Sequence, residues 1–311
     1  MRMKYRRLGK THIQISELSY GGSPLGGAFG IVDEHKGIQS LRRAIDLGIN
    51  FIDTSPLYGS TRSEALIGHA LKGVSRETFY IGTKVGRFGP TDFDFSVNRV
   101  TESVNESLRR LGVDYLDVVL CHDIEFVPVA QVFNDAIPAL QKLKESGKIR
   151  AIGVSGYPLK IYEMALDAVD LDVVLVYCHY NLVDTTLENL IPRLNAKHIG
   201  IISASPMGMG LLTGQELPPW HPAPVELREK CLEAFQFCES VGAPLKELAL
   251  QFATASHEIH STLVGMPSIS HVDENVSYYS TEFDPQHLND VLAILEPVRN
   301  NPWPSGLPEN N

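Results

Sequence analysis

Short apolar runs alternate with longer amphipathic segments along almost the whole sequence, and this alternation limits the folds that the chain can adopt. Eight of the runs are typical of strands, and most are continuously apolar, as parallel strands buried on both faces are. They cover Glu17–Gly21, Asn50–Asp53, Phe79–Lys84, Tyr115–Cys121, Arg150–Ser155, Val173–Cys178, Gly200–Ser203 and Thr262–Gly265. Helical patterns lie between them, among them Glu34–Leu47, Ser63–Leu71, Ser96–Leu111, Val129–Ser146 and Thr185–Ala196. The alternation predicts an α/β fold built on parallel strands.

Eight strand–helix units predict a (β/α)8 barrel, the TIM barrel, which takes about 250 residues plus insertions. The chain has 311 residues, and we assign the surplus to three segments. These are an N-terminal β-hairpin over Tyr5–Ile15, a loop over Gln215–Val225 and an extra C-terminal helix over Asp284–Arg299. We expect one domain over residues 1–311, with a tail from about residue 300 that is irregular or frayed.

The main alternative fold is a doubly wound Rossmann sheet. Its phosphate-binding turn appears as G-x-G-x-x-G between the first strand and the first helix. The glycines between Gly21 and Gly30 have a different spacing and a proline among them. The barrel is therefore favoured.

The acidic composition limits the classes of partner that we expect. The scattered cysteines indicate the cellular compartment. A formal net charge of -10 argues against nucleic acid or an anionic membrane surface as the main partner. No apolar stretch has the length of a bilayer-spanning helix or the place of a signal peptide. The four cysteines form no C-x-x-C pair, which is typical of reduced thiols. We expect a cytoplasmic protein, a monomer or small homo-oligomer, that acts on a small molecule.

Four polar residues stand at the ends of three neighbouring apolar runs. Asp53 and Tyr58 follow the second run, Lys84 ends the third and His122 follows the fourth. In a barrel these positions meet at the carboxyl ends of the strands, where active sites lie. An ammonium beside a phenol favours the phenolate and lowers the phenol pKa, so the group can move protons. Each residue alone has an ordinary explanation as a cap, a solvated cation or a packed ring, but together they predict a redox enzyme for carbonyls or alcohols.

The motifs around these residues resemble the aldo-keto reductase superfamily from about Tyr5 to Tyr279. They are Asp53-Thr-Ser-Pro-Leu-Tyr58-Gly, Thr83-Lys84, Leu120-Cys-His122, Gly153-Val-Ser155 and Ser205-Pro206. Within the superfamily, Cys121-His-Asp-Ile-Glu-Phe126 and Trp220-His-Pro-Ala223 are similar to the aldose 1-dehydrogenases that act on L-galactose. The resemblance implies that Tyr58 is the general acid/base and that His122 orients the substrate oxygen. It also implies that Lys84 tunes Tyr58 and pairs with Asp53.

The implied reaction is the NAD-dependent oxidation of an aldose at C1 to the lactone, with hydride transfer to nicotinamide. L-Galactose is the first expected substrate, and L-fucose and D-arabinose follow because their ring stereochemistry is closely related. Alternatives within the superfamily are a broad-specificity aldehyde or carbonyl reductase and a pyridoxal dehydrogenase. An alternative from another class is a nicotinamide-binding regulatory subunit, against which the complete set of four residues argues.

The resemblance also implies cofactor contacts at the ends of the later strands. They involve Ser155, Tyr177, Ser205, Pro206, Gly208, Gly210, Leu211, Gly265, Ser268, His271, Glu274 and Asn275. Ser155 matches the serine that binds the nicotinamide amide. The aromatic residue that usually stacks on nicotinamide is Ala204 here. Tyr177 either substitutes for it as a stacking face or packs within its strand, and both interpretations stay open.

The adenosine end of the implied cofactor site predicts NAD rather than NADP. NADP-dependent members carry Lys and Arg where this chain has Gly265 and His271. Without a fixed guanidinium, a 2′-phosphate loses its bidentate charge-assisted contact. Ser270 either contacts adenosine or caps the following helix.

The predicted rim loops carry four substrate-binding candidates, Phe29, Phe88, Asp123 and Trp220. Aromatic faces suit the apolar face of a sugar. Trp220 either contacts sugar or packs its loop, and Asp123 either binds a hydroxyl or caps a turn. No metal site is predicted, because His257-Glu-Ile-His260 has the wrong spacing for a zinc motif.

Overall fold

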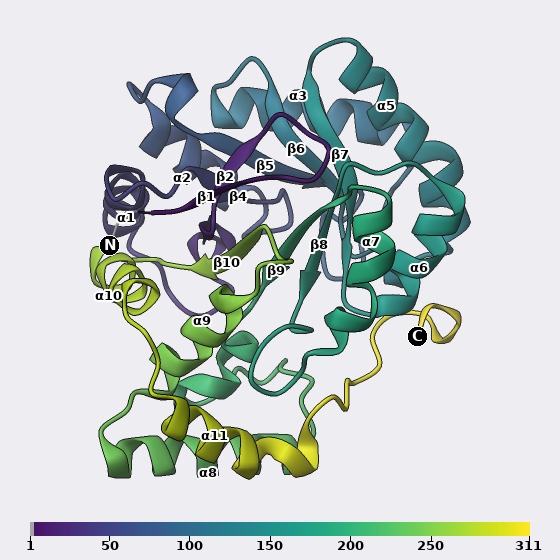
Figure 1. Cartoon of the computed structure of the whole chain (residues 1–311). Helices are drawn as coiled ribbons and strands as arrows, with labels where there is room; N and C mark the ends of the chain where they lie inside the picture. The colour runs from purple at the N-terminus through teal and green to yellow at the C-terminus, as the bar shows by residue number, and fades with distance from the viewer. Residues whose placement is uncertain (1–2) are drawn as a thin grey trace.

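Eight parallel strands form a closed barrel in the computed structural model, which describes residues 3–311. Their order around the barrel is β3 to β10, with β10 paired to β3. They span Leu18–Gly21 (β3), Phe51–Asp53 (β4), Tyr80–Val85 (β5), Leu116–Cys121 (β6), Ile149–Gly156 (β7), Val173–Tyr177 (β8), Gly200–Ala204 (β9) and Ser261–Gly265 (β10). The predicted TIM barrel is confirmed, and Figure 1 shows the helices around the strands.

The helices that follow the strands agree with the predicted pattern, except that one of them contains a π-helical segment. They are α1 (Glu34–Asp46), α2 (Arg62–Leu71), α3 (Val97–Leu111), α4 (Val129–Gln131), α5 (Ile137–Glu145), α6 (Leu159–Ala168), α7 (Ile191–Ala196), α9 (Leu245–Ala255) and α10 (Ile269–Ser280). Between α4 and α5 the residues Val132–Ala136 form a π-helical segment. Pro138 follows at the start of α5 and lacks the N–H that a regular α-helical bond to Asn134 requires. The predicted helix over 129–146 is therefore continuous in direction but not in hydrogen-bond pattern.

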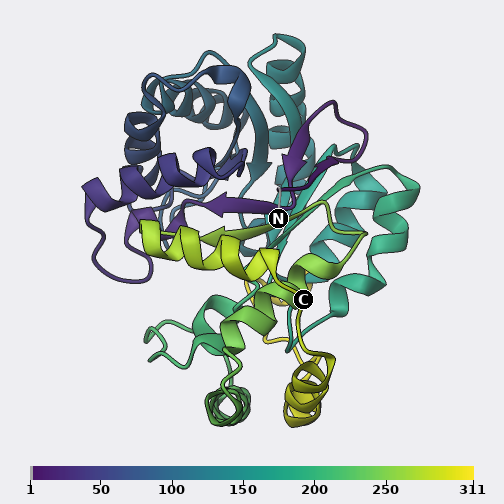
Figure 2. The ribbon, with the colours of Figure 1, turned by 60° about the vertical axis from the view of Figure 1, so that its left-hand side comes forward.

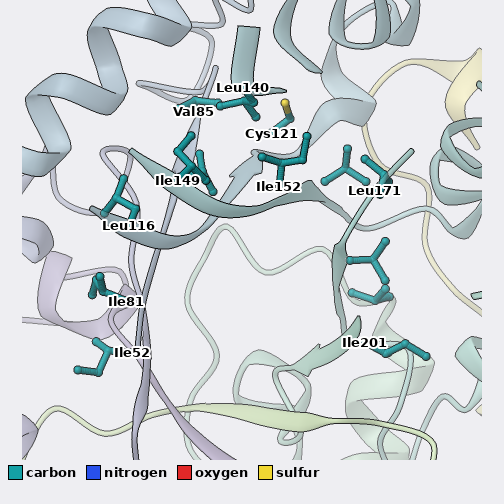
Figure 3. Close-up of a cluster of buried hydrophobic side chains, with 14 of the residues drawn as sticks. Ile52, Ile81, Val85, Leu116, Cys121, Leu140, Ile149, Ile152, Leu171 and Ile201 are labelled. Carbon is teal, nitrogen blue, oxygen red and sulfur yellow. The ribbon is translucent and has the colours of Figure 1, made fainter. Parts of the chain in front are cut away.

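Neighbouring side chains of a strand face two different cores, as the pleat of a strand requires. Leu120 of β6 belongs to the core inside the barrel. The next residue, Cys121, belongs to the larger core between the strands and the helices, which Figure 3 shows together with Leu140 of α5. Both faces of the sheet are thus buried, which explains the continuous apolar runs in the sequence.

The predicted hairpin is formed by β1 (Tyr5–Arg7) and β2 (Gln14–Ser16). Its turn residue Leu8 is fully buried in the core inside the barrel. Gly9, at φ 53°, lies so close to the start of β9 that a Cβ there would be 2.3 Å from the amide nitrogen of Gly200. Any side chain at this position would collide. The hairpin therefore closes the amino-terminal end of the barrel.

Two helices outside the barrel pattern pack side by side. They are α8 (Val225–Val241) and α11 (Pro285–Leu295), and both views show them next to each other (Figures 1 and 2). Their shared core includes Leu227, Cys231 and Val291. The predicted extra C-terminal helix is confirmed as α11, although it is shorter than expected and ends in a 3-10 turn over Glu296–Val298.

The tail after α11 is an irregular loop, the first of the two expected states, and it packs against the barrel. The ring of Trp303 stacks on that of Tyr157, with centroids 4.8 Å apart and an interplanar angle of 11°. The buried side chain of Asn310 donates to the backbone oxygens of Glu125 at 2.8 Å and Val127 at 3.0 Å. Aromatic stacking and buried hydrogen bonds hold the tail against the carboxyl end of the barrel.

Two further features concern helix apolarity and the cysteines. Between residues 3 and 311, no helix combines the length and the apolarity that crossing a bilayer requires. The four cysteines are free and buried, and burial raises the pKa of Cys178 and Cys231 to about 12. Thiols of this kind are poorly reactive, which agrees with a structural role.

Candidate active site

The four residues singled out in the sequence lie together at the carboxyl ends of β4, β5 and β6. Lys84 Nζ lies 2.5 Å from Asp53 Oδ2 and donates to the backbone oxygen of Thr54 at 2.8 Å. The same ammonium is 4.9 Å from the centre of the Tyr58 ring. The rings of Tyr58 and His122 are 5.6 Å apart and nearly perpendicular, at 87°. The strand order brings Asp53, Lys84 and His122 together, and the loop after β4 adds Tyr58.

The loop that carries Tyr58 is held by a close approach of two backbone segments. A Cβ at Gly26 would lie 2.4 Å from the carbonyl carbon of Tyr58, and a Cβ at Gly59 would lie 2.4 Å from the oxygen of Gly26. Gly59 also has a φ of 63°. Glycine is needed at both positions because the loop after β3 presses directly on the Tyr58 backbone.

Lys84 is held as a fixed cation by its buried ion pair with Asp53. Burial alone lowers the pKa of Lys84, but the negative charge of Asp53 and the hydrogen bond to it raise this pKa above its usual value. Lys84 is therefore an ammonium at neutral pH.

The Tyr58 phenol is less acidic than the sequence predicts. Removal from water raises the pKa of Tyr58 to about 12, although the charge of Lys84 lowers it. The charges of Asp53 and Asp123 add to the increase. The prediction that the cation lowers the phenol pKa was right for the contribution of Lys84 and wrong for the sum, because burial outweighs it. Tyr58 is protonated at neutral pH in the protein without ligands.

The imidazole of His122 is neutral, and each of its nitrogens lies near a polar oxygen. Burial, together with the charges of Lys84 and Arg87, places the pKa of His122 well below its usual value. Its Nδ1 lies 2.9 Å from Ser55 Oγ, and its Nε2 lies 3.4 Å from Asp123 Oδ2. Asp123 is in turn ion-paired with Arg87. This brings one substrate candidate, Asp123, directly to the four residues.

The cofactor candidates lie on β7 to β10 and the segments after them, on the other half of the barrel. Ser155 Oγ donates to the backbone oxygen of Cys121 at 3.4 Å, and the Tyr177 hydroxyl lies 3.5 Å from Glu125 Oε1. Ser205, Pro206, Gly208, Gly210 and Leu211 follow β9. Positive φ values of 60° at Ser205, 59° at Gly208 and 113° at Gly210 fold this segment into a compact loop.

The start of α10 corrects the predicted helix cap. Ser268, rather than Ser270, is the N-cap, and its Oγ accepts from the amide of His271 at 3.3 Å. Ser268 Oγ also lies 2.6 Å from His271 Nδ1 and 2.8 Å from Ser270 Oγ. Ser270 is the second residue of the helix, two positions after the N-cap.

Glu274 and Asn275 lie one turn further along α10. Burial alone raises the pKa of Glu274, but hydrogen bonds from Lys246 at 2.8 Å and Tyr278 at 2.9 Å bring it below its usual value. Asn275 donates to the backbone oxygen of His271, while its buried Oδ1 has no hydrogen-bond partner among the described residues. A hydrogen-bonded carboxylate and a buried, unpartnered amide oxygen thus lie one turn from the helix N-terminus.

Comparison with known proteins decides the family. A profile described as the Aldo/keto reductase family matches residues 17–296. The chain belongs to the aldo-keto reductase family. It is 48% identical to L-galactose dehydrogenase of Arabidopsis thaliana over 318 residues, 99% of each chain. It is 38% identical to D-arabinose 1-dehydrogenase of Saccharomyces cerevisiae over 256 residues, covering 77% of this chain and 75% of that protein.

The fold agrees with this assignment. The solved holo form of an aldo-keto reductase from Bacillus halodurans matches with a TM-score of 0.80 and 27% identity over 99% of both chains. The predicted resemblance to the family is confirmed. Aldo-keto reductases use nicotinamide cofactors, and this aldo-keto reductase is an oxidoreductase.

The remaining substrate candidates of this aldo-keto reductase differ in their contacts. Phe29 and Trp220 are exposed and contact each other edge to face, with ring centroids 5.6 Å apart. Phe88 instead packs under the Arg99 guanidinium, which is 4.1 Å from its ring centre. That contact favours a packing role for Phe88. No group of three or more metal-binding side chains occurs in the part of the chain that the structure describes.

Four residues that the sequence did not single out stand near this site. Ser55 lies within the Asp53–Tyr58 motif, and Arg87 lies three residues after Lys84, so their positions were a usable signal. Glu125 accepts from the Tyr157 amide at 3.1 Å and from Ser305 Oγ at 3.2 Å. Burial, and then the charge of Asp123, raise the pKa of Glu125 to about 8. Nothing in the sequence pattern indicated that Glu125 and the tail residue Trp303 would both contact Tyr157.

Proposed function

We propose that this aldo-keto reductase oxidises an aldose at C1 to the lactone, with NAD as the cofactor and L-galactose as the preferred substrate. The observation that carries the proposal is the 48% identity to L-galactose dehydrogenase across 99% of both chains. L-Fucose and D-arabinose are the next candidates. The geometry around Tyr58 supports the proposal because it places a phenol, an ammonium and a neutral imidazole at one point.

In the proposed reaction, Tyr58 accepts the proton of the anomeric hydroxyl as C1 loses its hydride. Lys84 lies beside the ring and stabilises the phenolate that accepts this proton. Asp53 holds the ammonium in place through the buried ion pair. His122 donates a hydrogen bond to the same substrate oxygen and keeps it within reach of Tyr58. A bound nicotinamide supplies the acceptor for the hydride.

The residues at the ends of β7 to β10 fit a nicotinamide dinucleotide. The N-terminus of α10 offers unpaired backbone N–H groups to a phosphate. The unpartnered Oδ1 of Asn275 suits an amine of the adenine ring. The compact glycine loop after β9 lets a ligand approach the backbone closely. We propose that Asn275, Ser205 and Ser155 hold the adenine, the diphosphate side and the nicotinamide amide respectively.

The sugar site follows from the same arrangement. The Asp123 carboxylate lies beside His122 and would accept a hydroxyl next to the reacting carbon. Phe29 and Trp220 would present aromatic faces to the apolar side of the ring. Because Arg87 fixes Asp123, this hydroxyl contact is sensitive to stereochemistry.

The proposal predicts a strong preference between mirror-image sugars. With NAD, kcat/KM for L-galactose should exceed that for D-galactose by about a hundredfold or more, because a misplaced hydroxyl leaves buried polar groups unpaired. The measurement follows the absorbance of reduced nicotinamide with both enantiomers, L-fucose and D-arabinose. D-Galactose is the matched control because it has the same groups in mirror-image arrangement. Turnover of pyridoxal or small aldehydes without turnover of any aldose would overturn the proposal.

The adenosine end predicts that NAD is used more efficiently than NADP. The Glu274 carboxylate would repel a 2′-phosphate and accept a ribose hydroxyl, and no guanidinium stands at His271. Replacing His271 with arginine should raise kcat/KM with NADP about tenfold to a hundredfold, the value of a charged hydrogen bond.

The control for this substitution adds the same charge elsewhere. His257 is exposed before β10, and His257→Arg should leave both cofactor efficiencies unchanged. A wild-type enzyme that prefers NADP by more than about tenfold would contradict the proposed contacts.

A further inference from the structure

We infer that Ser55 is a positioning residue that fixes the tautomer of His122, with the Arg87–Asp123 ion pair as a second constraint. The inference concerns which ring nitrogen carries the hydrogen. Its consequence for catalysis rests on the proposed function, whereas the tautomer itself is a property of the protein without ligands.

The hydrogen bonds of the buried Ser55 hydroxyl indicate which nitrogen of His122 carries the hydrogen. Ser55 Oγ lies 2.9 Å from His122 Nδ1 and accepts from the amide of Leu57 at 3.1 Å. Within residues 3–311, no other polar atom is hydrogen-bonded to this hydroxyl. If Nδ1 carried the hydrogen, Ser55 Oγ would accept twice and its own O–H would be buried without an acceptor. That arrangement is costly, so Ser55 donates and Nδ1 accepts.

Asp123 and Arg87 constrain the opposite side of the His122 ring. His122 Nε2 lies 3.4 Å from Asp123 Oδ2, which is close but is not a hydrogen bond by angle. Arg87 pairs with the same carboxylate oxygen, and its guanidinium lies 5.2 Å from the Phe93 ring centre and 4.6 Å from that of Phe126. This packing keeps the carboxylate beside the imidazole. An unprotonated Nε2 would set a lone pair against a carboxylate oxygen, so Nε2 carries the hydrogen.

The two contacts therefore agree on the Nε2–H tautomer. Because His122 is neutral, it has only one N–H to offer, and the contacts point it to the side of the ring on which Asp123 lies. In the proposed reaction this hydrogen is donated to the oxygen on C1. The other tautomer would present a lone pair to that oxygen and could not orient it.

The direct test is nitrogen NMR of protein labelled with ¹⁵N-histidine, without sugar or cofactor. A His122→Gln variant identifies the His122 signals by their loss. We expect Nδ1 to resonate as an unprotonated nitrogen and Nε2 as a protonated one from pH 6 to pH 9. A protonated Nδ1, or averaging between the tautomers, would overturn the inference. Since no turnover is needed, this result stands apart from success or failure of the sugar assay.

The matched variants are Ser55→Ala, Ser55→Thr and Ser103→Ala. Ser55→Ala should shift the Nδ1 resonance and lower kcat about tenfold, with KM for NAD unchanged, because one buried hydrogen bond is lost. Ser55→Thr keeps the hydroxyl and should restore the Nδ1 resonance towards that of wild type. Ser103 is equally buried but its Oγ has no partner in the described structure, so Ser103→Ala should change neither quantity. An unchanged Nδ1 signal in a folded Ser55→Ala protein would refute the role of Ser55.

Discussion

Replacing Tyr58 with phenylalanine should lower kcat for sugar oxidation by about 10²–10⁴-fold, the usual contribution of a positioned general base. The substitution keeps the ring, and with it the packing against His122 and Lys84. KM for NAD should change little. Steady-state kinetics of the variant and the wild type with L-galactose measure the effect. Activity that survives the loss of this oxygen would rule out Tyr58 as the acid/base.

The pH dependence of the same reaction provides a second measurement on Tyr58. Oxidation needs the phenolate, and burial raises the pKa of Tyr58 to about 12. The phenolate fraction therefore rises with pH below that value, and oxidation should accelerate through the alkaline range. The Tyr58→Phe variant should lack this rise. Tyr5→Phe is the control, because Tyr5 is an exposed residue of the hairpin that closes the opposite end of the barrel.

Replacing Lys84 with methionine should lower the free energy of unfolding by about 3–5 kcal/mol, because it leaves the Asp53 carboxylate buried without its partner. Both side chains are almost completely inaccessible to solvent, at 1% and 2% exposure. Urea unfolding followed by circular dichroism measures the change. The loss should also be accompanied by a fall in activity, since the ammonium beside Tyr58 is removed.

Two variants separate the buried charge from the packing. Adding Asp53→Asn to Lys84→Met should recover part of the lost stability, because no charge then remains uncompensated. Arg193→Met breaks the ion pair with Asp167, whose side chains are 44% and 73% exposed, and should cost less than about 1 kcal/mol. Equal effects of Lys84→Met and Arg193→Met would contradict the importance of burial.

The barrel and the meeting of the four polar residues were predictable for one physical reason. Parallel strands buried on both faces give continuous apolar runs, and each run ends at the same rim. A residue's place after its run, as with His122, therefore fixes its place in the site. The motif of Asp53 to Tyr58 contains Ser55, but this residue was not singled out because its bond to His122 Nδ1 joins two segments that are distant in the sequence.

The features that the sequence did not predict depend mostly on contacts between segments distant in the sequence. Trp303 meets Tyr157 and Asn310 meets Glu125 across 146 and 185 residues, and no local pattern reports such pairings. The Tyr58 pKa was misjudged because the sequence gives the neighbouring charge but not the degree of burial. Ser268 and Ser270 are equally good caps by type, and only the backbone at the end of β10 distinguishes them.

Because Leu8 and Gly9 cover the amino-terminal end of the barrel, that end is occupied by packing, and the candidate reacting groups lie at the opposite end. The amino-terminal end of the barrel thus maintains the architecture, and the carboxyl end carries the chemistry. Laboratory evolution toward new sugars can be confined to the loops at the carboxyl end, such as those of Phe29 and Trp220. The residues at the amino-terminal end can be kept constant so that the stability of the fold is preserved.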